Sequence, residues 1–436
     1  SNWYMEDVTG DGNNDQVVVY TEDASYGAAF DPNLLVYQWD SFDPDSPNYR
    51  TATPWVNAKN GPITFFETPL TLTNSITLDK ATDDGSFRLN YSKFDQTGLL
   101  PNSSIRKDNF SINGNYKFND KLTASGYANY IKTNGKGRNS TGYNDNIVGM
   151  FKQWFQTNVD IKQQKEAYFS TGRNITWNPA TSEAGSAPIF WDNPYWTRYE
   201  NYETDARNRF VGNATLNYEF NDWLNVTGRV ATDTYTEIQE ERRANGSVPG
   251  DFGITRGSAD SGYGRKNFDV SETNYDLMFN FDKDLSEKLN LKGIAGVNIR
   301  RNVFKSIYVS TAGGLSVPKL YSLQNSKDPI PLPEETDQIS GVDGIYASAS
   351  FGYDNMLFLD ATIRRDRSST LPKGNSVFIY PSVASSFVFT KLVNQDWLTF
   401  GKFRINYAEV GNDAPFDFLY DTYVVNIPPG APSTSV

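Results

Sequence analysis

An Asp-rich stretch near the start of the chain has the spacing of a cation-binding loop. Oxygen-bearing side chains alternate along it at Asp7, Thr9, Asp11, Asn13 and Asp15. Gly12 stands where such a loop bends sharply, as in an EF-hand or in the DxxGDGxxD calcium loop of some β-propeller repeats. A true EF-hand is excluded, because its twelfth position would be Val18 instead of Glu. The stretch predicts either a site for calcium or another cation, or a solvated Asn/Gly turn without metal.

Tryptophans outside the regularly alternating segments are a second group of candidates. They stand at Trp39, Trp55, Trp154, Trp177, Trp191 and Trp196. Indole faces stack on sugar rings and grip peptide side chains. We therefore take Trp154, Trp177, Trp191 and Trp196 as candidate substrate-binding residues. The alternative is that these rings pack within the loops or contact a partner protein that covers them.

Catalytic chemistry finds little support in the composition. The chain has no His and no Cys, which removes imidazole and thiolate metal sites, Ser-His-Asp triads and disulfides. With 52 acidic residues, close carboxylate pairs arise by chance, and no motif places a proton-donating acid opposite a nucleophile. A net charge of -12 argues against nucleic acid as a partner. We expect no enzyme activity, no catalytic residues and no required cofactor, with calcium as the one candidate ion.

The elements that must carry these residues are β-strands. In FVGNATLNYEF, residues 210–220, apolar and polar side chains alternate with a period of two, and after Asn221-Asp222 the alternation resumes. A soluble β-sandwich would also explain one such hairpin. The unit recurs, however, and predicts about twelve strands in six hairpins, at 72–78 and 87–91, 110–118 and 122–130, 210–220 and 224–233, 275–281 and 289–299, 345–353 and 357–363, and 383–389 and 397–407.

The connections between these strands favour a membrane barrel. They alternate between a turn of a few residues and a loop of roughly ten to seventy, the pattern of outer-membrane barrels with short periplasmic turns and long extracellular loops. No stretch approaches the ~20 apolar residues of a transmembrane helix. We predict an all-β fold, a transmembrane antiparallel β-barrel in the cell outer membrane. Leu216 and Val226 should face lipid, Asn217 and Arg229 the lumen, and the Asn221-Asp222 turn the periplasm.

Two regions differ from this pattern. Residues 1–68 are turn-rich and predict an extracellular loop region that carries the cation-binding turn, whereas residues 69–436 predict part of the barrel. Inside one long loop, Asn146–Tyr168 has apolar residues at helical spacing and predicts a helix packed on the barrel rim. Both ends of the chain, including the loop-like PPGAPSTSV, look like cuts within a longer protein.

A charged cluster stands where a late strand passes into an extracellular loop. Its members are Arg364, Arg365, Asp366 and Arg367. We expect an ion-paired network inside the barrel. Binding of an anionic ligand or of a barrel plug is the alternative.

Several short stretches of the sequence also match a known protein family. The chain resembles the SusC-like family of TonB-dependent outer-membrane transporters from Bacteroidetes. The matching stretches are NYRTATPW (48–55), FFET (65–68), GLLPNS (98–103), GKGRNSTGYNDNIVGMFKQWFQTNVDI (135–161), RRDRSSTLPKGN (364–375) and YPSVASSFVF (380–389). The resemblance implies a 22-stranded barrel with an N-terminal plug. About 12 of the strands would lie in this chain, and the plug and the C-terminal strands would not.

The resemblance also implies a function and partners. SusC-like proteins import glycan oligosaccharides or peptides beneath a SusD-like surface lipoprotein. Energy comes from the TonB-ExbB-ExbD complex, through the plug region that is missing here. The other expected contacts are outer-membrane lipid and lipopolysaccharide. A barrel that serves a larger surface complex as a structural or docking subunit is the alternative function. A soluble propeller or sandwich enzyme, suggested by the Asp7–Asp15 loop, is the third hypothesis.

Overall fold

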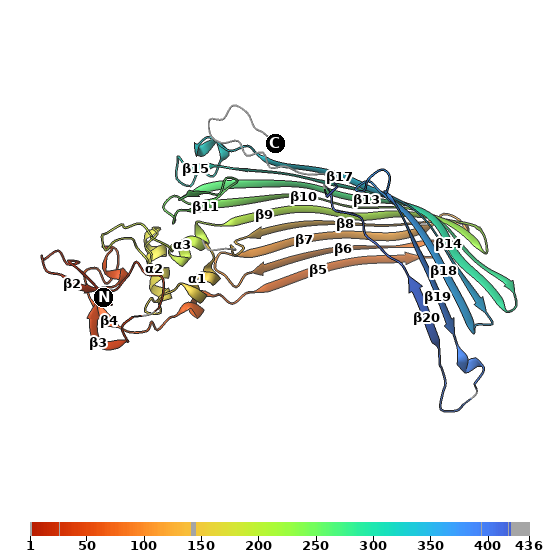
Figure 1. Cartoon of the computed structure of the whole chain (residues 1–436), viewed down its shortest axis with the longest axis horizontal. Helices are drawn as coiled ribbons and strands as arrows, with labels where there is room; N and C mark the ends of the chain where they lie inside the picture. Colours follow the sequence, from red (N-terminus) through yellow and green to blue (C-terminus); the bar gives the residue numbers. More distant parts are fainter. Residues whose placement is uncertain (1, 26, 141–144, 394, 417, 420–436) are drawn as a thin grey trace.

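A curved antiparallel sheet dominates the protein (Figure 1). The computed structural model describes residues 2–25, 27–140, 145–393, 395–416 and 418–419. The sheet has 12 strands, and each pairs with its neighbour in chain order. They are β5 (Thr71–Thr82), β6 (Gly85–Thr97), β7 (Ser104–Lys117), β8 (Leu122–Lys136), β9 (Glu203–Asn221), β10 (Leu224–Arg243), β13 (Gly262–Ser286), β14 (Leu289–Ser310), β17 (Glu334–Tyr353), β18 (Leu357–Ser368), β19 (Val377–Phe387) and β20 (Phe403–Ala408). The prediction of twelve strands in six hairpins is confirmed.

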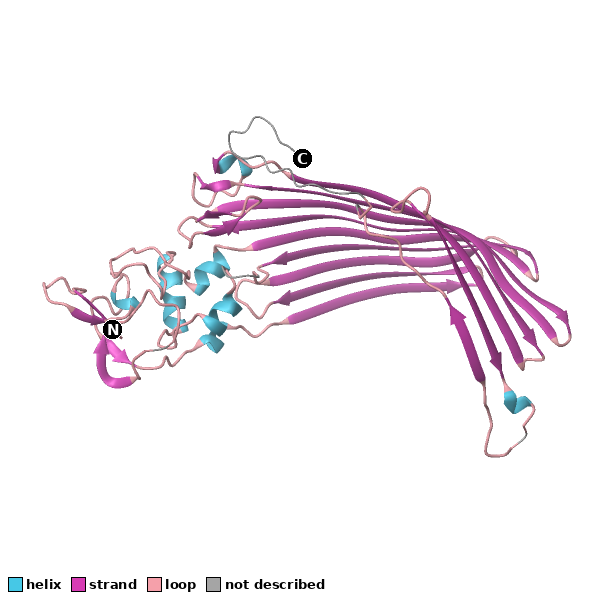
Figure 2. Ribbon diagram, viewed as in Figure 1, coloured by secondary structure: helices cyan, strands magenta, loops and turns pink. Residues whose placement is uncertain are grey.

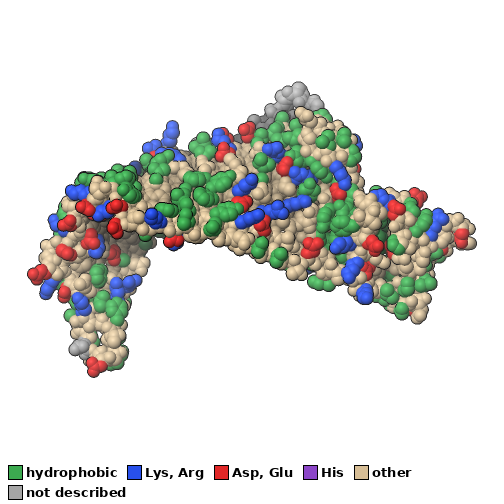
Figure 3. Space-filling view, turned by 180° about the vertical axis from the view of Figure 1, so that it is seen from behind, with side chains coloured by type: hydrophobic (Ala, Val, Ile, Leu, Met, Phe, Trp, Pro, Cys, Tyr) green, Lys and Arg blue, Asp and Glu red, His purple; other side chains and the backbone are tan. Residues whose placement is uncertain are grey.

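The two faces of the sheet differ in chemistry, as the alternation predicts. Leu216 lies opposite Ala124 and Gly228 in register, on the face that we call the outer face. Its side chain is 55% exposed, because no described residue covers it. Figure 3 shows this side of the molecule, where hydrophobic side chains gather over the strands.

The other face, which we call the inner face, carries polar cross-strand pairs. Thr227 donates a hydrogen bond of 2.9 Å to Asn217 across β9 and β10. Arg229 forms an ion pair of 2.9 Å with Asp276 on β13. These contacts place Asn217 and Arg229 on one face, opposite to the face of Leu216, as predicted.

The short turns lie at one end of the sheet and the long connections at the other (Figure 2). The β9–β10 turn is Asp222-Trp223, one residue later than predicted, because Asn221 is the last residue of β9 and pairs with Leu224. The last turn is longer than predicted, since β19 ends at Phe387 and β20 begins at Phe403. The 3-10 helix Phe389–Lys391 (η4) lies between them, and the ring of Phe389 takes the space beside Gly401. The predicted turn at 393–396 and the terminal PPGAPSTSV fall partly and wholly outside the described residues.

Several strands extend beyond the predicted segments at the long-loop end. For example, β13 has 25 residues and β14 has 22. The added residues mix polar and apolar side chains on both faces, with Phe268 and Val270 on one face and Val303 and Ile307 on the other, so the strict alternation marked only the central part of each strand. Three short strand pairs lie among the loops: β3 (Asp31–Val36) with β4 (Thr53–Trp55), β11 (Gly250–Phe252) with β12 (Gly257–Ala259), and β15 (Ala312–Leu315) with β16 (Ser326–Asp328). A fourth pair joins β1 (Tyr4–Glu6) to β2 (Asp15–Val17).

A helical loop domain stands at the long-loop end of the sheet (Figure 2). The single helix predicted at Asn146–Tyr168 is wrong, because the segment forms α1 (Ile147–Gln153) and α2 (Ile161–Thr171). Asp160 interrupts it by accepting hydrogen bonds from the amides of Lys162 and Gln163, which begins a new helix. A third helix, α3 (Pro194–Tyr199), was not predicted. Among the described residues, no helix combines the length and apolar composition needed to cross a membrane.

The loop domain has two cores of its own. The larger is built from α1, α2, α3 and the 3-10 helix Pro62–Phe65 (η2), and the 3-10 helix Trp39–Ser41 (η1) contributes Trp39. Its fully buried side chains include Phe65, Ile147, Met150 and Trp177. The smaller core joins β2, β3 and β4 through Val17, Val36 and Trp55. These cores hold the loops together at the long-loop end of the sheet (Figure 2).

Candidate functional site

A cavity of about 620 Å³ lies on the inner face at the long-loop end, and we call it the mouth pocket. The ends of β9, β10, β13, β14 and β17 form one wall, and the β11–β12 hairpin closes it together with Arg138, Ser140, Asp145, Arg198, Asn201 and Tyr202. Its lining residues are Arg138, Ser140, Asp145, Arg198, Asn201, Tyr202, Glu203, Gln239, Glu241, Arg242, Arg243, Asp251, Phe252, Gly253, Ile254, Arg256, Gly264, Lys266, Tyr308 and Glu334.

Strand register explains why distant residues meet there. One row across the sheet joins Gln239, Lys266, Tyr308 and Glu334, which are successive partners on β10, β13, β14 and β17. The next row pairs Glu203 with Glu241 and Glu241 with Gly264. All these side chains share the inner face, so charged groups from β9, β10, β13 and β17 and the Tyr308 hydroxyl of β14 converge on one surface.

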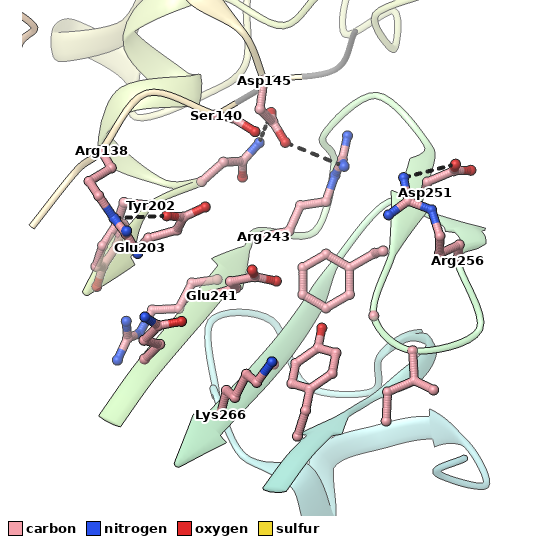
Figure 4. Close-up of a pocket in the computed structure, with 18 of the residues that line it drawn as sticks. Arg138, Ser140, Asp145, Tyr202, Glu203, Glu241, Arg243, Asp251, Arg256 and Lys266 are labelled. Atoms are coloured by element: carbon pink, nitrogen blue, oxygen red, sulfur yellow. Dashed lines mark hydrogen bonds and ion pairs between the residues drawn. The ribbon is translucent and has the colours of Figure 1, made fainter. Parts of the chain in front are cut away.

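The two rows place like charges side by side. Glu203 and Glu241 are direct cross-strand partners, an arrangement that costs stability unless a cation compensates it. Arg138 supplies part of that charge, with Nε 3.6 Å from a Glu203 oxygen and Nη2 2.7 Å from Asp205 (Figure 4). Glu241 therefore offers a carboxylate toward the cavity that is not held in an ion pair with any described residue.

Cations line the opposite part of the pocket. Lys266 stands beside Glu241 on the neighbouring strand, and Arg256 reaches in from the loop hairpin, 3.4 Å from Asp251 (Figure 4). Lys266 forms no ion pair with a described residue, and its closest described aromatic contact is the ring of Phe268, 5.1 Å from the ammonium. The pocket thus presents separate negative and positive groups a short distance apart.

Gly264 gives this arrangement its space. A Cβ at this position would lie 3.2 Å from the Tyr308 hydroxyl and 3.5 Å from a Glu241 oxygen. Any larger side chain would displace the tyrosine or the carboxylate from the pocket wall.

A buried arginine behind the pocket holds one segment of its rim in place. Arg198 is 2% exposed and donates hydrogen bonds to the carbonyl oxygens of Pro101, Gly137 and Arg138. These contacts hold the chain segment from which Arg138 projects. The guanidinium has no carboxylate in hydrogen-bonding contact among the described residues, and burial lowers the pKa of Arg198.

A second group of buried polar residues ties the loop domain to β10. Arg243 lies 3.4 Å from Asp145, and Asp192 accepts hydrogen bonds from Asn174 (2.8 Å) and from the amide of Val248 (2.8 Å). Burial, reinforced by the nearby Asp145, raises the pKa of Asp192 to about 7. Asp192 therefore links Asn174 of the loop domain to the segment that follows β10.

The candidate tryptophans lie elsewhere. Trp177, Trp191 and Trp196 are 1%, 4% and 6% exposed within the larger loop core, and Trp154 packs against it. Trp39 and Trp55 are buried as well. Their ring faces contact the chain itself, which is the packing role named as the alternative. The mouth pocket contains none of the candidate tryptophans.

The Asp7–Asp15 loop is closed by its own hydrogen bonds. The Asp7 carboxylate accepts the amides of Gly10 (2.7 Å), Asp11 (3.0 Å) and Gly12 (2.8 Å), which lowers the pKa of Asp7. Asp15 accepts the amides of Val8 and Thr9. Asp11 accepts the amide of Asn13. The described residues contain no group of three or more acidic side chains placed to hold a metal, and cation binding stays a prediction.

The predicted charge cluster divides between the two faces. Arg364 and Asp366 pair at 2.9 Å, on the face of their register partners Tyr346 and Gly344, which is the inner face. Arg365 and Arg367 alternate with them and stand on the outer face. The expected ion-paired network inside the barrel is therefore confirmed only for Arg364 and Asp366. The alternation of faces along the strand, counted from the apolar Ile363, would have predicted that Arg364 and Asp366 lie on one face and Arg365 and Arg367 on the other.

Sequence reasoning missed the mouth pocket. Its charged residues come from segments more than 190 positions apart, and no motif joins them. The parity of each strand could have assigned Glu203, Glu241, Lys266 and Glu334 to the inner face. The loops that close the pocket could not have been placed in this way.

Comparisons with known proteins agree with the fold. TonB-dependent receptor P26 of Formosa agariphila is 21% identical over 390 residues, which cover 85% of this chain and 35% of that protein. The RagAB peptide transporter structure matches with a TM-score of 0.66 and 15% identity, over 84% of this chain and 40% of that chain. The RagAB peptide importer in its 'closed-closed' state gives 0.68 and 14%, over 93% and 42%. No protein-family model matches the chain.

The chain thus spans about a third of the length of its curated relative and less than half of each RagAB chain. These relatives are receptors and transporters, in agreement with the expectation that the protein is not an enzyme. The chain has the fold of the TonB-dependent outer-membrane receptors and forms a portion of their β-barrel.

Proposed function

We propose that the whole protein imports short peptides across the outer membrane and that the mouth pocket receives them. The observation that carries this proposal is the separation of charge in the pocket. A peptide with free ends bears an ammonium and a carboxylate. Glu203 and Glu241 would receive the ammonium, and Lys266 and Arg256 the carboxylate. The likeness to the RagAB peptide importer supports the same substrate class.

Oligosaccharides are the weaker candidate of the two that the sequence suggested. Neutral sugars are usually held by exposed aromatic faces. Of the four candidate tryptophans, Trp177, Trp191 and Trp196 are buried in the loop core, and Trp154 is partly buried against it. The pocket wall is instead rich in charged groups, which neutral sugars would leave unpaired.

The proposed partners follow from the same comparison. A SusD-like lipoprotein would cover the mouth pocket from outside, and the TonB complex would drive release through the plug of the whole protein. Exposed apolar side chains on the loops offer contacts for such a lipoprotein, including Ile63 (79% exposed), Phe169 (52%) and Leu332 (87%). The strands β5 and β20 form the two edges of the described sheet, and we propose that they pair with further barrel strands of the whole protein.

Blocked peptides test the proposal at the level of single charges. The whole protein is titrated calorimetrically with a short peptide, its N-acetylated form and its C-amidated form. Glu241→Gln should weaken binding of the free peptide about 10-fold and leave the acetylated peptide unaffected, because a charge-assisted hydrogen bond contributes ~1.5–3 kcal/mol. Lys266→Gln should weaken binding of the free peptide by a similar factor and leave the amidated peptide unaffected. Arg88→Gln, on the inner face of β6 and outside the pocket, is the matched control.

Two results would contradict the proposal. One is equal affinity for free and doubly blocked peptides. The other is unchanged affinity in both pocket variants. A protein that binds no peptide yet still assembles with a surface lipoprotein would favour the structural or docking subunit.

A further inference from the structure

A second cavity, of about 430 Å³, lies on the inner face below the mouth pocket, and we call it the lumen cavity. Two neighbouring rows of register partners on β10, β13, β14 and β17 line it. The upper row is Tyr235, Val270, Phe304 and Gln338, and the lower row is Asp233, Glu272, Asn302 and Ser340. The upper row lies about 13 Å of extended strand from the row of Lys266 in the mouth pocket.

Aromatic rings form the part of the lumen cavity nearest the mouth pocket. Phe304 lines the cavity, and its ring centre lies 6.2 Å from that of Phe268, which continues the apolar surface upward. The guanidinium of Arg207 lies 4.7 Å from the ring centre of Tyr235, the second aromatic residue of the upper row. The charge of Arg207 is already paired with Glu237 at 2.5 Å. The rings therefore stand beside the cavity in a setting that already accommodates a cation.

The lower row of the lumen cavity carries one carboxylate without a cation. Asp233 and Glu272 are direct cross-strand partners, which places like charges side by side. Arg209 compensates Asp233 by donating a hydrogen bond of 2.7 Å from Nε. Glu272 accepts a hydrogen bond of 3.0 Å from Asn274 but forms no ion pair with a described residue. Arg300, one row further down on β14, lies outside the cavity lining and is in no ion pair within the described part of the chain.

The rest of the lining supplies acceptors but no positive charge. Asn302, Gln338 and Ser340 contribute amide and hydroxyl oxygens, and among the described residues that line the cavity none is a Lys or an Arg. Phe416, from the segment that follows β20, adds a further ring. Figure 1 shows this segment crossing the concave side of the sheet. The lumen cavity therefore combines a free carboxylate, aromatic rings and neutral acceptors in an open space.

A carboxylate beside aromatic rings binds organic cations, because the ring faces attract positive charge and the carboxylate accepts charged hydrogen bonds. We propose that the lumen cavity binds the ammonium or guanidinium group of a Lys or Arg side chain on a transported peptide. Glu272 takes the charge, Phe304 supplies the ring contact, and Asn302 or Gln338 accepts the remaining N–H groups. The apolar stem of the side chain lies against Val270. The ligand class rests on the proposed function, and the lumen cavity is a second binding site that a peptide reaches after the mouth pocket.

Doubly blocked peptides separate the two sites, because they lack the terminal charges that the mouth pocket would bind. The whole protein is titrated calorimetrically with the N-acetylated, C-amidated tripeptide Gly-Lys-Gly and with its norleucine analogue, which has no side-chain charge. The lysine peptide should bind about 10-fold more tightly than the norleucine peptide. Glu272→Gln should abolish that difference and leave the norleucine peptide unaffected. Phe304→Leu should weaken binding of the lysine peptide about 3-fold, because the ring contact is lost.

Asp360→Asn is the matched control, because it removes a carboxylate from the inner face of β18 outside the lumen cavity, and it should leave both affinities unchanged. Three results would overturn the proposal. The first is equal affinity for the lysine and norleucine peptides. The second is binding of the lysine peptide by Glu272→Gln within about 2-fold of the parent, which would indicate that a cation of the whole protein fills the cavity. The third is a loss of affinity in Glu241→Gln alone, which would place the lysine in the mouth pocket. None of the three bears on the selection of free peptide ends, which the singly blocked peptides measure separately.

Discussion

A charge placed at Leu216 should destabilise the protein in a way that its neighbours on the inner face do not. Leu216 stands on the outer face of β9 between the aromatic residues Phe210 and Phe220. It faces Ala124 and Gly228 in register, and small side chains there leave it open to lipid. An arginine at this position would be surrounded by hydrocarbon.

The expected cost follows from the depth of the residue. Leu216 lies six positions after Phe210 and four before Phe220. At about 3.4 Å per residue and a strand tilt of about 40°, these separations correspond to about 16 Å and about 10 Å of membrane depth. Leu216 is therefore slightly off the centre of an apolar band of about 25 Å. Arg at the midplane costs about 2–4 kcal/mol, so Leu216→Arg should cost about 2–3 kcal/mol.

Denaturant unfolding of the whole protein folded into lipid vesicles measures this cost. The midpoint should fall while the slope of the transition stays constant. Ser125→Arg is the matched control, because Ser125 is exposed on the inner face of the adjacent β8. It should change stability by less than about 0.5 kcal/mol. A harmless Leu216→Arg together with a destabilising Ser125→Arg would show that the two faces are reversed.

Three further predictions concern the loop end. Burial raises the pKa of Asp192 from 3.8 to about 7, so the folded loop domain holds a proton that the unfolded chain releases. The contribution of this proton to the free energy of unfolding is therefore complete at low pH and is lost as the pH rises through 7. Asp192→Asn should abolish this dependence in hydrogen exchange of α3 between about pH 5 and pH 8, whereas an unchanged dependence would assign it to another group. Trp177→Ala, at a side chain 1% exposed, should cost about 3–5 kcal/mol and expose residues 145–200 to protease without loss of the folded barrel; equal protease resistance would contradict the packing role. Gly264→Val should lower peptide affinity at least 10-fold, because Cβ would lie 3.2 Å from the Tyr308 hydroxyl, and unaltered affinity would remove the β13 wall from the binding site.

The sheet could be predicted from sequence because each strand has the same alternation of apolar and polar side chains. One face meets apolar surroundings and the other meets water, so the period of two is repeated in every hairpin. The prediction was inaccurate where that contrast ends. The extended parts of β13 and β14 mix polar and apolar side chains on both faces, and β20 begins at Phe403 after a loop that packs Phe389 beside Gly401.

The site could be predicted only in part. Parity decides that Arg364 points inward and Arg365 outward, and it was available in the sequence. The pocket also needs the β11–β12 hairpin and Arg138, and the chain segment that carries Arg138 is held by the buried Arg198. Tryptophan content suggested ligand contact, but it could not show that Trp177 and Trp191 are buried in the loop core.

Thiol accessibility tests the central claim, that the inner face is a wet lumen and the outer face meets lipid. The chain has no Cys, so single cysteines can be placed in it without removing others. In lipid nanodiscs, the whole protein with Cys at position 217 or 229 should react with a small charged maleimide. With Cys at position 216 or 226 it should resist that reagent and react with an apolar, lipid-soluble one. Labelling of 216 and 226 by the charged reagent, with 217 and 229 protected, would contradict the account.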